Sequence, residues 1–378
     1  MDAVNRIATE IGARRPTSLG EAQAAAYLDG RMRRAGLRVS ADAFRAAAGP
    51  GWDGVVLALL ATIGVVLYYW LPLPSLALGL WNLATAGVAL ARPGAPLLAR
   101  KRQSQNVIAT RAIDEPPRWR VVLLAPLDSP PATSALTRRL TAGRRAALGR
   151  VAACGLIVLL ALLALGGPLE LRRVFWYLQI AGAAYLLLLA AFEIWTVLAS
   201  ATPGAINHAG ALAALLESAD SLNGLSRTEL WAVALGASSS GVGLADLLRR
   251  YPFDREMTLF IGIESIGAGR LSYITRTGIF PQRPGDTLLL SLVAGADADD
   301  PLIDAEPRPY ASEPVLVHQL ETTGRRALTI IGLDGDGRPA YRGSMADTPE
   351  HVDDRALDRA IRLIVGLVKK IDSTSSEV

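Results

Sequence analysis

The chain has 378 residues, of which 51% are hydrophobic, and its formal net charge is only +4. Its mean hydropathy of +0.29 is high for a soluble enzyme, so membrane-spanning segments have to be considered first. Three histidines and a single cysteine, Cys154, argue against a histidine-rich metal site and exclude an intrachain disulfide. No run of basic residues alternates with aromatic ones, so we do not expect a nucleic-acid partner.

The soluble parts of the sequence alternate between helical and strand-like segments. Residues 2–35 form a polar amphipathic region that predicts helix, and it ends at Gly36. The predicted strands are residues 37–44, 106–110, 119–125, 229–236, 258–263, 287–293 and 327–332, and the predicted later helices are 209–218, 244–251 and 354–371. This alternation predicts an α/β fold, with a mainly parallel (mixed) sheet flanked by helices on both faces.

Four apolar runs interrupt this pattern, at residues 55–73, 76–91, 148–165 and 174–198. A membrane-spanning helix needs roughly 20 apolar residues, and about 17 at the least. The first and fourth runs reach that length, the third comes close, and the second is marginal. The runs predict four transmembrane helices in two hairpins. The competing interpretation is that they are core helices of a large soluble protein, but uncharged runs of this length are rare there.

Basic residues flank the hairpins unevenly. The first hairpin turn, residues 71–75, has no Lys or Arg, and the second has two. The opposite side carries the larger set Arg92, Arg100, Lys101, Arg102, Arg138, Arg139, Arg144, Arg145 and Arg150. The positive-inside rule therefore predicts a multi-pass protein of the inner or plasma membrane, with its soluble domain and both termini in the cytoplasm. We expect Glu193, inside the fourth run, to face another helix or an interface.

The predicted boundaries divide one α/β domain into three parts. They are a first part at 1–51, hairpin 1 at 52–91, a second part at 92–147, hairpin 2 at 148–198, a third part at 199–371 and a disordered tail at 372–378.

Seven short motifs follow one another along the soluble segments. They are GARRPTS at 12–18, NVIA at 106–109, APLDS at 125–129, GAINHAG at 204–210, SSSG at 238–241, ESIG at 264–267 and GSMADT at 343–348. Their order resembles that of the M28 family of zinc aminopeptidases, and the resemblance covers the soluble sequence except residues 271–321. It implies the M28 phosphorylase/hydrolase-like fold, into which the two hairpins are inserted.

The resemblance also implies where a zinc pair and a general base would lie. Such a site needs imidazole and carboxylate ligands, one of them bridging the two ions, and a glutamate that takes a proton from water. The ligand positions hold Pro126, Asn207, Ser239, Glu264 and Gly343, and the general-base position holds Ser238. Only Glu264 keeps a carboxylate. Asp128, which in the family orients the first histidine, has no histidine to orient. We therefore expect no zinc and no catalytic residue.

A residual cleft is nevertheless predicted. Its candidate residues are Asp128, Asn207, His208, Glu264 and Asp347. His208 could be a displaced ligand, although it more simply caps the following helix. A serine-hydrolase set of Ser238, His208 and Asp128 lacks the G-x-S-x-G elbow. The acidic segments at 297–304 and 333–337 lack the final glutamate of a calcium loop.

The leading functional hypothesis is a membrane-anchored M28-like pseudoenzyme that serves as a binding or assembly subunit of a membrane complex. The nicastrin and nicalin type is similar in being membrane-tethered and metal-less. The expected partners are the lipid bilayer and a membrane protein or a second copy of the chain. One alternative is a zinc-dependent aminopeptidase or other metallo-hydrolase with displaced ligands. Another is a ligand sensor that uses the old substrate cleft.

Overall fold

The computed structural model describes residues 1–91, 96, 98–113, 115–141, 143–165, 168–277, 283–310, 316 and 318–374. The chain forms two compact units. We call them the α/β unit, made of Met1–Ala46, Arg102–Pro130 and Ala201–Val378, and the hairpin unit, made of Ala47–Lys101 and Pro131–Ser200.

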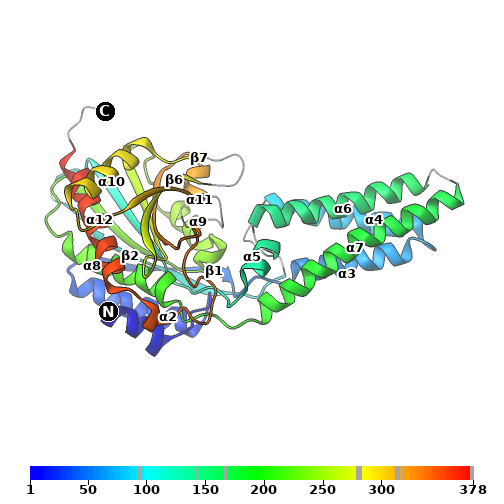
Figure 1. Cartoon of the computed structure of the whole chain (residues 1–378), viewed down its shortest axis with the longest axis horizontal. Helices are drawn as coiled ribbons and strands as arrows, with labels where there is room; N and C mark the ends of the chain where they lie inside the picture. The colour runs from blue at the N-terminus through cyan, green and yellow to red at the C-terminus, as the bar shows by residue number, and fades with distance from the viewer. Residues whose placement is uncertain are drawn as a thin grey trace. The chain divides into compact units, whose positions relative to one another are not determined.

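A nine-stranded sheet forms the centre of the α/β unit (Figure 1). Its order is β1-β2-β4-β3-β5-β9-β6-β7, and β8 pairs with β6. The central pairs β3–β4, β3–β5 and β5–β9 are parallel, whereas β2–β4 and β6–β9 are antiparallel. The strands are β1 Arg38–Ala47, β2 Lys101–Arg111, β3 Trp119–Pro126, β4 Thr228–Leu235, β5 Thr258–Glu264, β6 Arg270–Thr277, β7 Arg283–Pro284, β8 Glu306–Tyr310 and β9 Arg326–Leu333. The predicted mixed sheet is confirmed.

Helices cover both faces of this sheet, as the sequence predicted. They are α1 Asp2–Asn5, α2 Leu19–Arg34, α8 Gly210–Ser221, α9 Val242–Arg250, α10 Thr287–Asp299, α11 His318–Thr322 and α12 Asp354–Ser373, with short turns η1 Arg6–Ile11, η2 Ala205–Ala209, η3 Ser238–Ser240 and η4 Pro349–His351. Side-chain hydrogen bonds mark several helix starts. Ser18 accepts from the Glu21 N–H, and Asp353 accepts from the Arg355 N–H.

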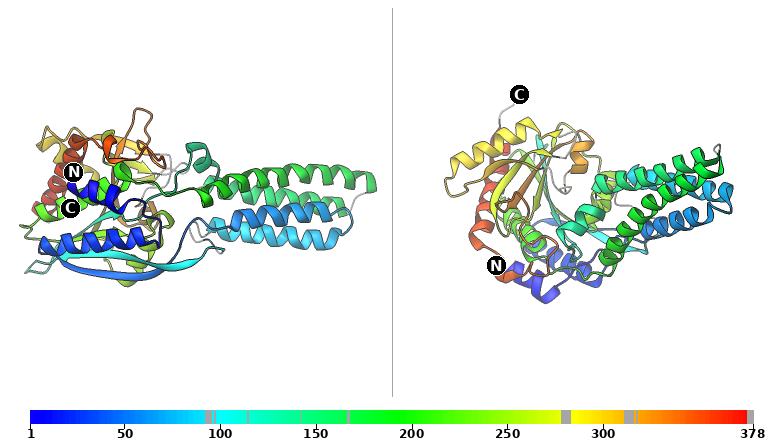
Figure 2. Two further views of the ribbon diagram at one scale, coloured as in Figure 1. Left: turned by 90° about the horizontal axis from the view of Figure 1, so that it is seen from below. Right: turned by 45° about the vertical axis from the view of Figure 1, so that its right-hand side comes forward.

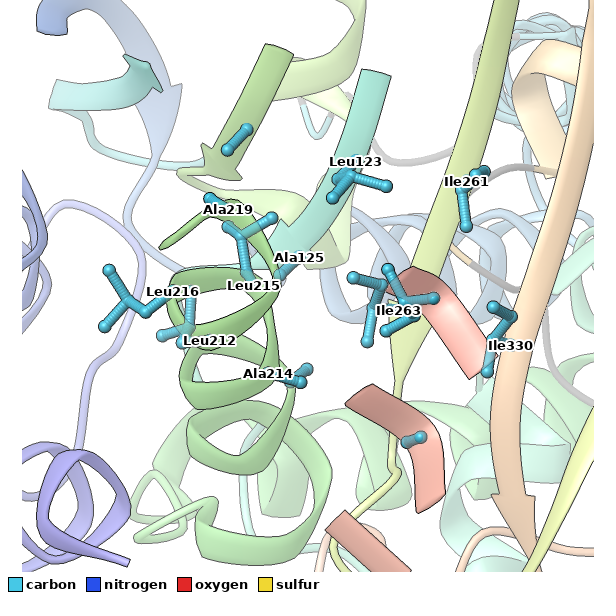
Figure 3. Close-up of a cluster of buried hydrophobic side chains, with 14 of the residues drawn as sticks. Leu123, Ala125, Leu212, Ala214, Leu215, Leu216, Ala219, Ile261, Ile263 and Ile330 are labelled. Carbon is cyan, nitrogen blue, oxygen red and sulfur yellow. The ribbon is translucent and has the colours of Figure 1, made fainter. Parts of the chain in front are cut away.

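Successive side chains of β3 point to opposite faces of the sheet, and each face has its own hydrophobic core. Leu123 and Ala125 belong to the larger cluster, which α8 and α12 cover, whereas Val122 and Leu124 belong to the smaller one, which α9 covers. Figure 3 shows the larger cluster, where Leu212 and its neighbours on α8 lie against β3 and β5. A central strand that is buried on both faces reads as an uninterrupted apolar run, which is why its position was predictable.

One predicted strand is wrong. Residues 287–293 are the first half of helix α10, which continues to Asp299. The Asp286 side chain accepts a hydrogen bond from the Leu289 N–H and so caps this helix. The run TLLLSLV is apolar without a clear period, and a short run of that kind fits a buried strand and a buried helix equally well.

The hairpin unit consists of long helices that pack side by side (Figure 2). They are α3 Asp53–Leu67, α4 Pro72–Ala91, α6 Gly143–Leu165 and α7 Leu169–Leu198, preceded by the short α5 Ala135–Thr141. Helices α3 and α6 each pack against both α4 and α7. Side-chain bonds cross between these helices: for example, Tyr68 Oη donates to the Ala161 carbonyl at 2.8 Å, and Trp176 Nε1 donates to the Val65 carbonyl at 2.7 Å.

Three of these helices, α4, α6 and α7, are long and apolar enough to cross a membrane, within the described residues. Of the two helices of the first hairpin, the first was predicted to be the longer. The structure shows the reverse, since α3 has 15 residues and α4 has 20. The predicted turn at residues 71–75 also lies earlier in the chain, because α4 begins at Pro72. Proline suits the first position of a helix, since its missing N–H would have no partner there. The count of four spans stays a prediction.

Glu193 lies against another helix, as expected from the cost of a charge among apolar helices. Its carboxylate forms a salt bridge with Arg150, which belongs to α6. The two side chains are 14% and 16% exposed, so the charges are paired and largely buried.

Candidate functional site

The candidate site lies where the parallel strands of the α/β unit end. Because β3 runs parallel to both β4 and β5, the carboxyl ends of all three strands meet at one edge of the sheet. Pro126 is the last residue of β3 and is buried, Glu264 is the last residue of β5, and Ser238 follows β4 in the turn η3. The predicted site positions are thus neighbours in the fold.

Asp128 is fully buried, and its carboxylate is hydrogen-bonded to the turn after β4. It accepts hydrogen bonds from the backbone N–H of Ser238 at 2.6 Å and of Ser239 at 3.3 Å. The residue before this turn, Ala237, has a positive φ of 44°, a conformation that costs a non-glycine residue energy. Asp128 therefore stabilises the turn that carries the two serines.

His208 is 7% exposed and contacts the same residue. Its ring Nδ1 is hydrogen-bonded to the Asp128 carbonyl oxygen. A carbonyl can only accept, so Nδ1 carries the proton and Nε2 is left as the acceptor. The pKa of His208 is lowered to about 4, mainly by burial; the charge and backbone of Asp128 oppose this shift, and the positive charges of Arg342 and Arg14 add to it. The imidazole is neutral at neutral pH.

Asn207 is held by hydrogen bonds on both ends of its amide. Its Nδ2 donates to Asp347 Oδ2 at 2.7 Å and to the Ala340 carbonyl at 3.0 Å, and its Oδ1 accepts from the Ser265 hydroxyl at 2.6 Å. Asp347 also accepts from the Ile206 N–H at 2.6 Å. Burial raises the pKa of Asp347 above its ordinary value, and these hydrogen bonds oppose that shift.

Glu264 is 5% exposed and faces a guanidinium group. Arg342 Nη1 lies 3.6 Å from Glu264 Oε2, and the Leu316 N–H donates to Oε1. The next residue in the chain after Arg342 is Gly343, which has a φ of 67° and no side chain that could bind a metal. The last two predicted cleft residues, Glu264 and Asp347, are therefore each satisfied by groups of the protein.

Sequence reasoning missed Arg14 as a site residue, although it lies inside the first motif. Its side chain is completely buried, and burial lowers its pKa to about 10, so it stays charged at neutral pH. The guanidinium donates to the carbonyl oxygens of Ile7, Gly12, Leu127, Pro203 and Gly204. Arg14 thus ties together the first turn, the loop after β3 and the loop before η2.

Glu21 was also missed. It is 2% exposed and accepts hydrogen bonds from the Thr17 N–H, the Ala237 N–H and the Ser104 hydroxyl. Burial, and secondarily the charge of Asp128, raise the pKa of Glu21 to about 7. The S-x-x-E spacing of Ser18 and Glu21 signals a helix start, but it does not reveal that the carboxylate reaches a distant strand end.

The donors at this edge do not fit a pair of zinc ions. A zinc ligand must offer a free lone pair on nitrogen, oxygen or sulfur, and Pro126 and Gly343 have no such side-chain atom. Asn207 donates both amide protons to protein groups, and its amide oxygen accepts a hydrogen bond from a third. Over the residues that the structure describes, no group of three or more His, Cys, Asp or Glu side chains is arranged to hold a metal ion.

No protein-family model matches the chain, and no curated protein matches it in sequence. Solved structures do match. The zinc aminopeptidase BSAP of Bacillus subtilis aligns with a TM-score of 0.59 at 12% identity, over 98% of this chain and 93% of that one. The aminopeptidase of Aneurinibacillus sp. strain AM-1 gives 0.57 at 13% identity, over 97% and 92%. The glutaminyl cyclase of Porphyromonas gingivalis gives 0.56 at 12% identity, over 98% and 96%. The chain therefore has the fold of M28-type zinc aminopeptidases and glutaminyl cyclases.

Proposed function

We propose that this protein is a membrane-anchored pseudoenzyme with an M28-type scaffold, which binds a partner and neither holds zinc nor hydrolyses peptides. The observation that carries the proposal is the set of hydrogen bonds that the Asn207 amide makes. It occupies the position of the bridging ligand, and its amide is fully bonded to Asp347, Ala340 and Ser265. A bridging ligand has to be a carboxylate with lone pairs directed at two ions, which a neutral and fully bonded amide does not offer.

The charge around Glu264 supports the same conclusion. Arg342 lies 3.6 Å from its carboxylate and also acts electrostatically on His208. Glu264 and His208 are the two side chains at this edge whose chemistry best suits a metal ligand. A fixed guanidinium beside both supplies the positive charge that a metal ion would otherwise supply, and it repels a divalent cation.

The general-base position supports it as well. Ser238 and Ser239 stand where the family has a pair of glutamates, and their backbone N–H groups bind Asp128. A serine hydroxyl does not take a proton from water at neutral pH, so a base is lacking even if a metal were to bind.

The hairpin unit supports a membrane anchor. Helices α4, α6 and α7 are long and apolar enough to span, and the basic residues flank them on the side opposite the hairpin turns. We therefore propose a multi-pass protein whose α/β unit lies in the cytoplasm. Its partner would be another membrane protein or a second copy of the chain.

Elemental analysis of the detergent-purified full-length protein tests the loss of zinc. The protein is incubated with zinc and dialysed, beside a zinc aminopeptidase of the same fold as a positive control. We expect less than about one tenth of an equivalent per chain, because a structural or catalytic site needs at least three protein ligands. One or two retained ions per chain would overturn the proposal.

A zinc hydrolase with displaced ligands is the second candidate, and one observation favours it. The Asp128 carbonyl binds His208 Nδ1 and so leaves Nε2 free of a proton, as a carbonyl hydrogen-bonded to a histidine that ligates a metal does. This candidate requires His208→Ala to abolish zinc retention. Under the leading proposal the variant and the wild type retain equally little.

A further inference from the structure

A shallow cavity of about 380 Å³ lies on the α/β unit at the edge of the sheet. Its lining comes from two strands, with Ala43, Phe44 and Arg45 from β1 and Arg102 and Gln103 from β2. We call it the strand-edge groove. β1 is the outermost strand on this side of the sheet, so no further strand covers the groove. Phe44 is buried at its base, whereas Arg45, Arg102 and Gln103 are exposed.

The groove carries positive charge that the described part of the protein does not neutralise. Neither Arg45 nor Arg102 forms a salt bridge or a side-chain hydrogen bond with a described residue. The closest carboxylate along β1 is Asp42, which accepts a hydrogen bond from the Tyr251 hydroxyl. The two guanidinium groups, unpaired among the described residues, and the Gln103 amide nitrogen are donors, so the groove is suited to an anion with several oxygen atoms.

Both strands of the groove continue directly into the first hairpin. β1 ends at Ala47 and α3 begins at Asp53, and β2 follows α4. Within the hairpin unit, the Ala48 N–H donates to the Arg100 carbonyl at 2.9 Å and the Trp52 N–H donates to the Leu98 carbonyl at 3.3 Å. Two backbone hydrogen bonds therefore join the segments that follow β1 and precede β2, as far as the residue before α3. That residue, Trp52, is 42% exposed, as tryptophans at a membrane–water interface commonly are.

We infer that the strand-edge groove binds the phosphate headgroup of an anionic phospholipid, with Arg45 and Arg102 as its two ligands. Guanidinium groups bind phosphate oxygens through paired N–H···O bonds. Basic residues next to a membrane helix are attracted to an anionic leaflet, and each contributes roughly a fivefold gain in affinity. The inference rests on the proposed membrane anchor, but it is independent of whether the protein binds zinc.

Native mass spectrometry of the full-length protein in a neutral detergent tests the inference. Phosphatidylglycerol or phosphatidylcholine is added, and the bound lipids per chain are counted for the wild type, for Arg45→Gln/Arg102→Gln and for Arg34→Gln/Arg38→Gln. The last variant is a matched control, because Arg34 and Arg38 are exposed arginines outside the groove with no side-chain bond to a described residue. Equal melting temperatures show that all three proteins are folded.

We expect the wild type and the control to retain phosphatidylglycerol in preference to phosphatidylcholine. The groove variant loses two arginines and should bind phosphatidylglycerol about 25-fold more weakly. Equal retention by all three proteins would overturn the inference. So would loss of lipid binding in millimolar inorganic phosphate, because the groove would then be a site for a soluble phosphate compound. Failure of the membrane anchor is seen separately, as release of the protein from membranes by alkaline carbonate.

Discussion

Asn207 Nδ2 lies 2.7 Å from Asp347 Oδ2, and both side chains are fully buried. The same carboxylate accepts from the Ile206 backbone, and the Ala205 N–H donates to the Asp347 carbonyl at 3.1 Å. Three consecutive residues at the start of η2 are therefore bonded to one aspartate in the loop before α12. The hydrogen bond that occupies the Asn207 amide therefore also holds two distant loops together.

Asn207→Asp should therefore destabilise the protein and should not restore a metal site. The change removes two donated hydrogen bonds and places a second carboxylate against Asp347 without access to water. Breaking a buried polar pair in this way costs about 3 kcal/mol. Thermal unfolding of the purified protein measures the loss, and Asn223→Asp, the same change at an exposed position, should have little effect. A variant of unchanged stability that retains zinc would contradict both the structure and the proposed function.

The raised pKa of Glu21 predicts a pH-dependent contribution to stability. Its folded pKa of about 7 lies above the ordinary 4.5, so the folded state holds the proton more tightly than the unfolded state does. The contribution is therefore complete below about pH 4.5 and is lost as the pH rises to about 7. Glu21→Gln should become more stable relative to wild type between pH 5 and pH 8, by on the order of 2 kcal/mol.

The difference between the melting curves of variant and wild type measures this effect. It cancels the opposite contribution of His208, whose lowered pKa favours the folded state at higher pH. Glu115→Gln is the control, because Glu115 is exposed, and its difference from wild type should not change with pH. A Glu21→Gln difference that is equally flat would show that Glu21 is ionised throughout.

Arg14→Lys should be strongly destabilising although the charge is kept. The guanidinium reaches five carbonyl oxygens in three segments, and a single ammonium group cannot. Each buried carbonyl that loses its donor costs about 1 kcal/mol or more, so we expect a loss of roughly 3 kcal/mol. Arg15→Lys, at the next and partly exposed position, should change stability by less than about 0.5 kcal/mol. Similar melting temperatures for the two variants would contradict the assigned role.

The Arg150–Glu193 pair allows a double-mutant cycle in the hairpin unit. Arg150→Met leaves the Glu193 carboxylate largely buried without its partner, which should cost about 3 kcal/mol. Arg150→Met/Glu193→Met removes both charges and should recover most of that loss. Thermal unfolding in detergent provides the measurement. Strictly additive losses would mean that the two side chains do not interact.

The central strands and the inserted helices were predictable because each signal is local. β3, β4, β5 and β9 are mainly apolar runs bounded by turns, because their central residues are buried on both faces of the sheet. The strand β6 and its partners β7 and β8 were not predicted. β7 is exposed, and β8 is partly exposed and contains two prolines, so neither composition nor period marks these two as strands. β6 is mostly buried and was missed although residues 271–274 form a buried run.

The site was predictable only in part. The motif order predicted which residues gather at the edge of the sheet, and the structure links Asp128, Asn207, His208 and Asp347 by direct hydrogen bonds or chain adjacency. Their function as a cleft stays a prediction. Arg14 and Glu21 were not predicted because their partners, such as Pro203 and Ala237, are distant in the chain. A polar residue does not reveal in sequence that it will be buried.

The position of β3 in the sheet has a consequence for biosynthesis. β3 pairs on one side with β4 and on the other with β5, and both follow the second hairpin in the chain. On the ribosome this apolar strand is therefore complete before β4 or β5 has been synthesised. It has neither partner while α6 and α7 are translated. Unpaired apolar strands aggregate, so under the proposed membrane anchor we expect the nascent chain to need rapid membrane insertion or a chaperone at this stage. We expect chains that stop before β4 to be degraded, and slow insertion of the second hairpin to limit the yield of the whole protein.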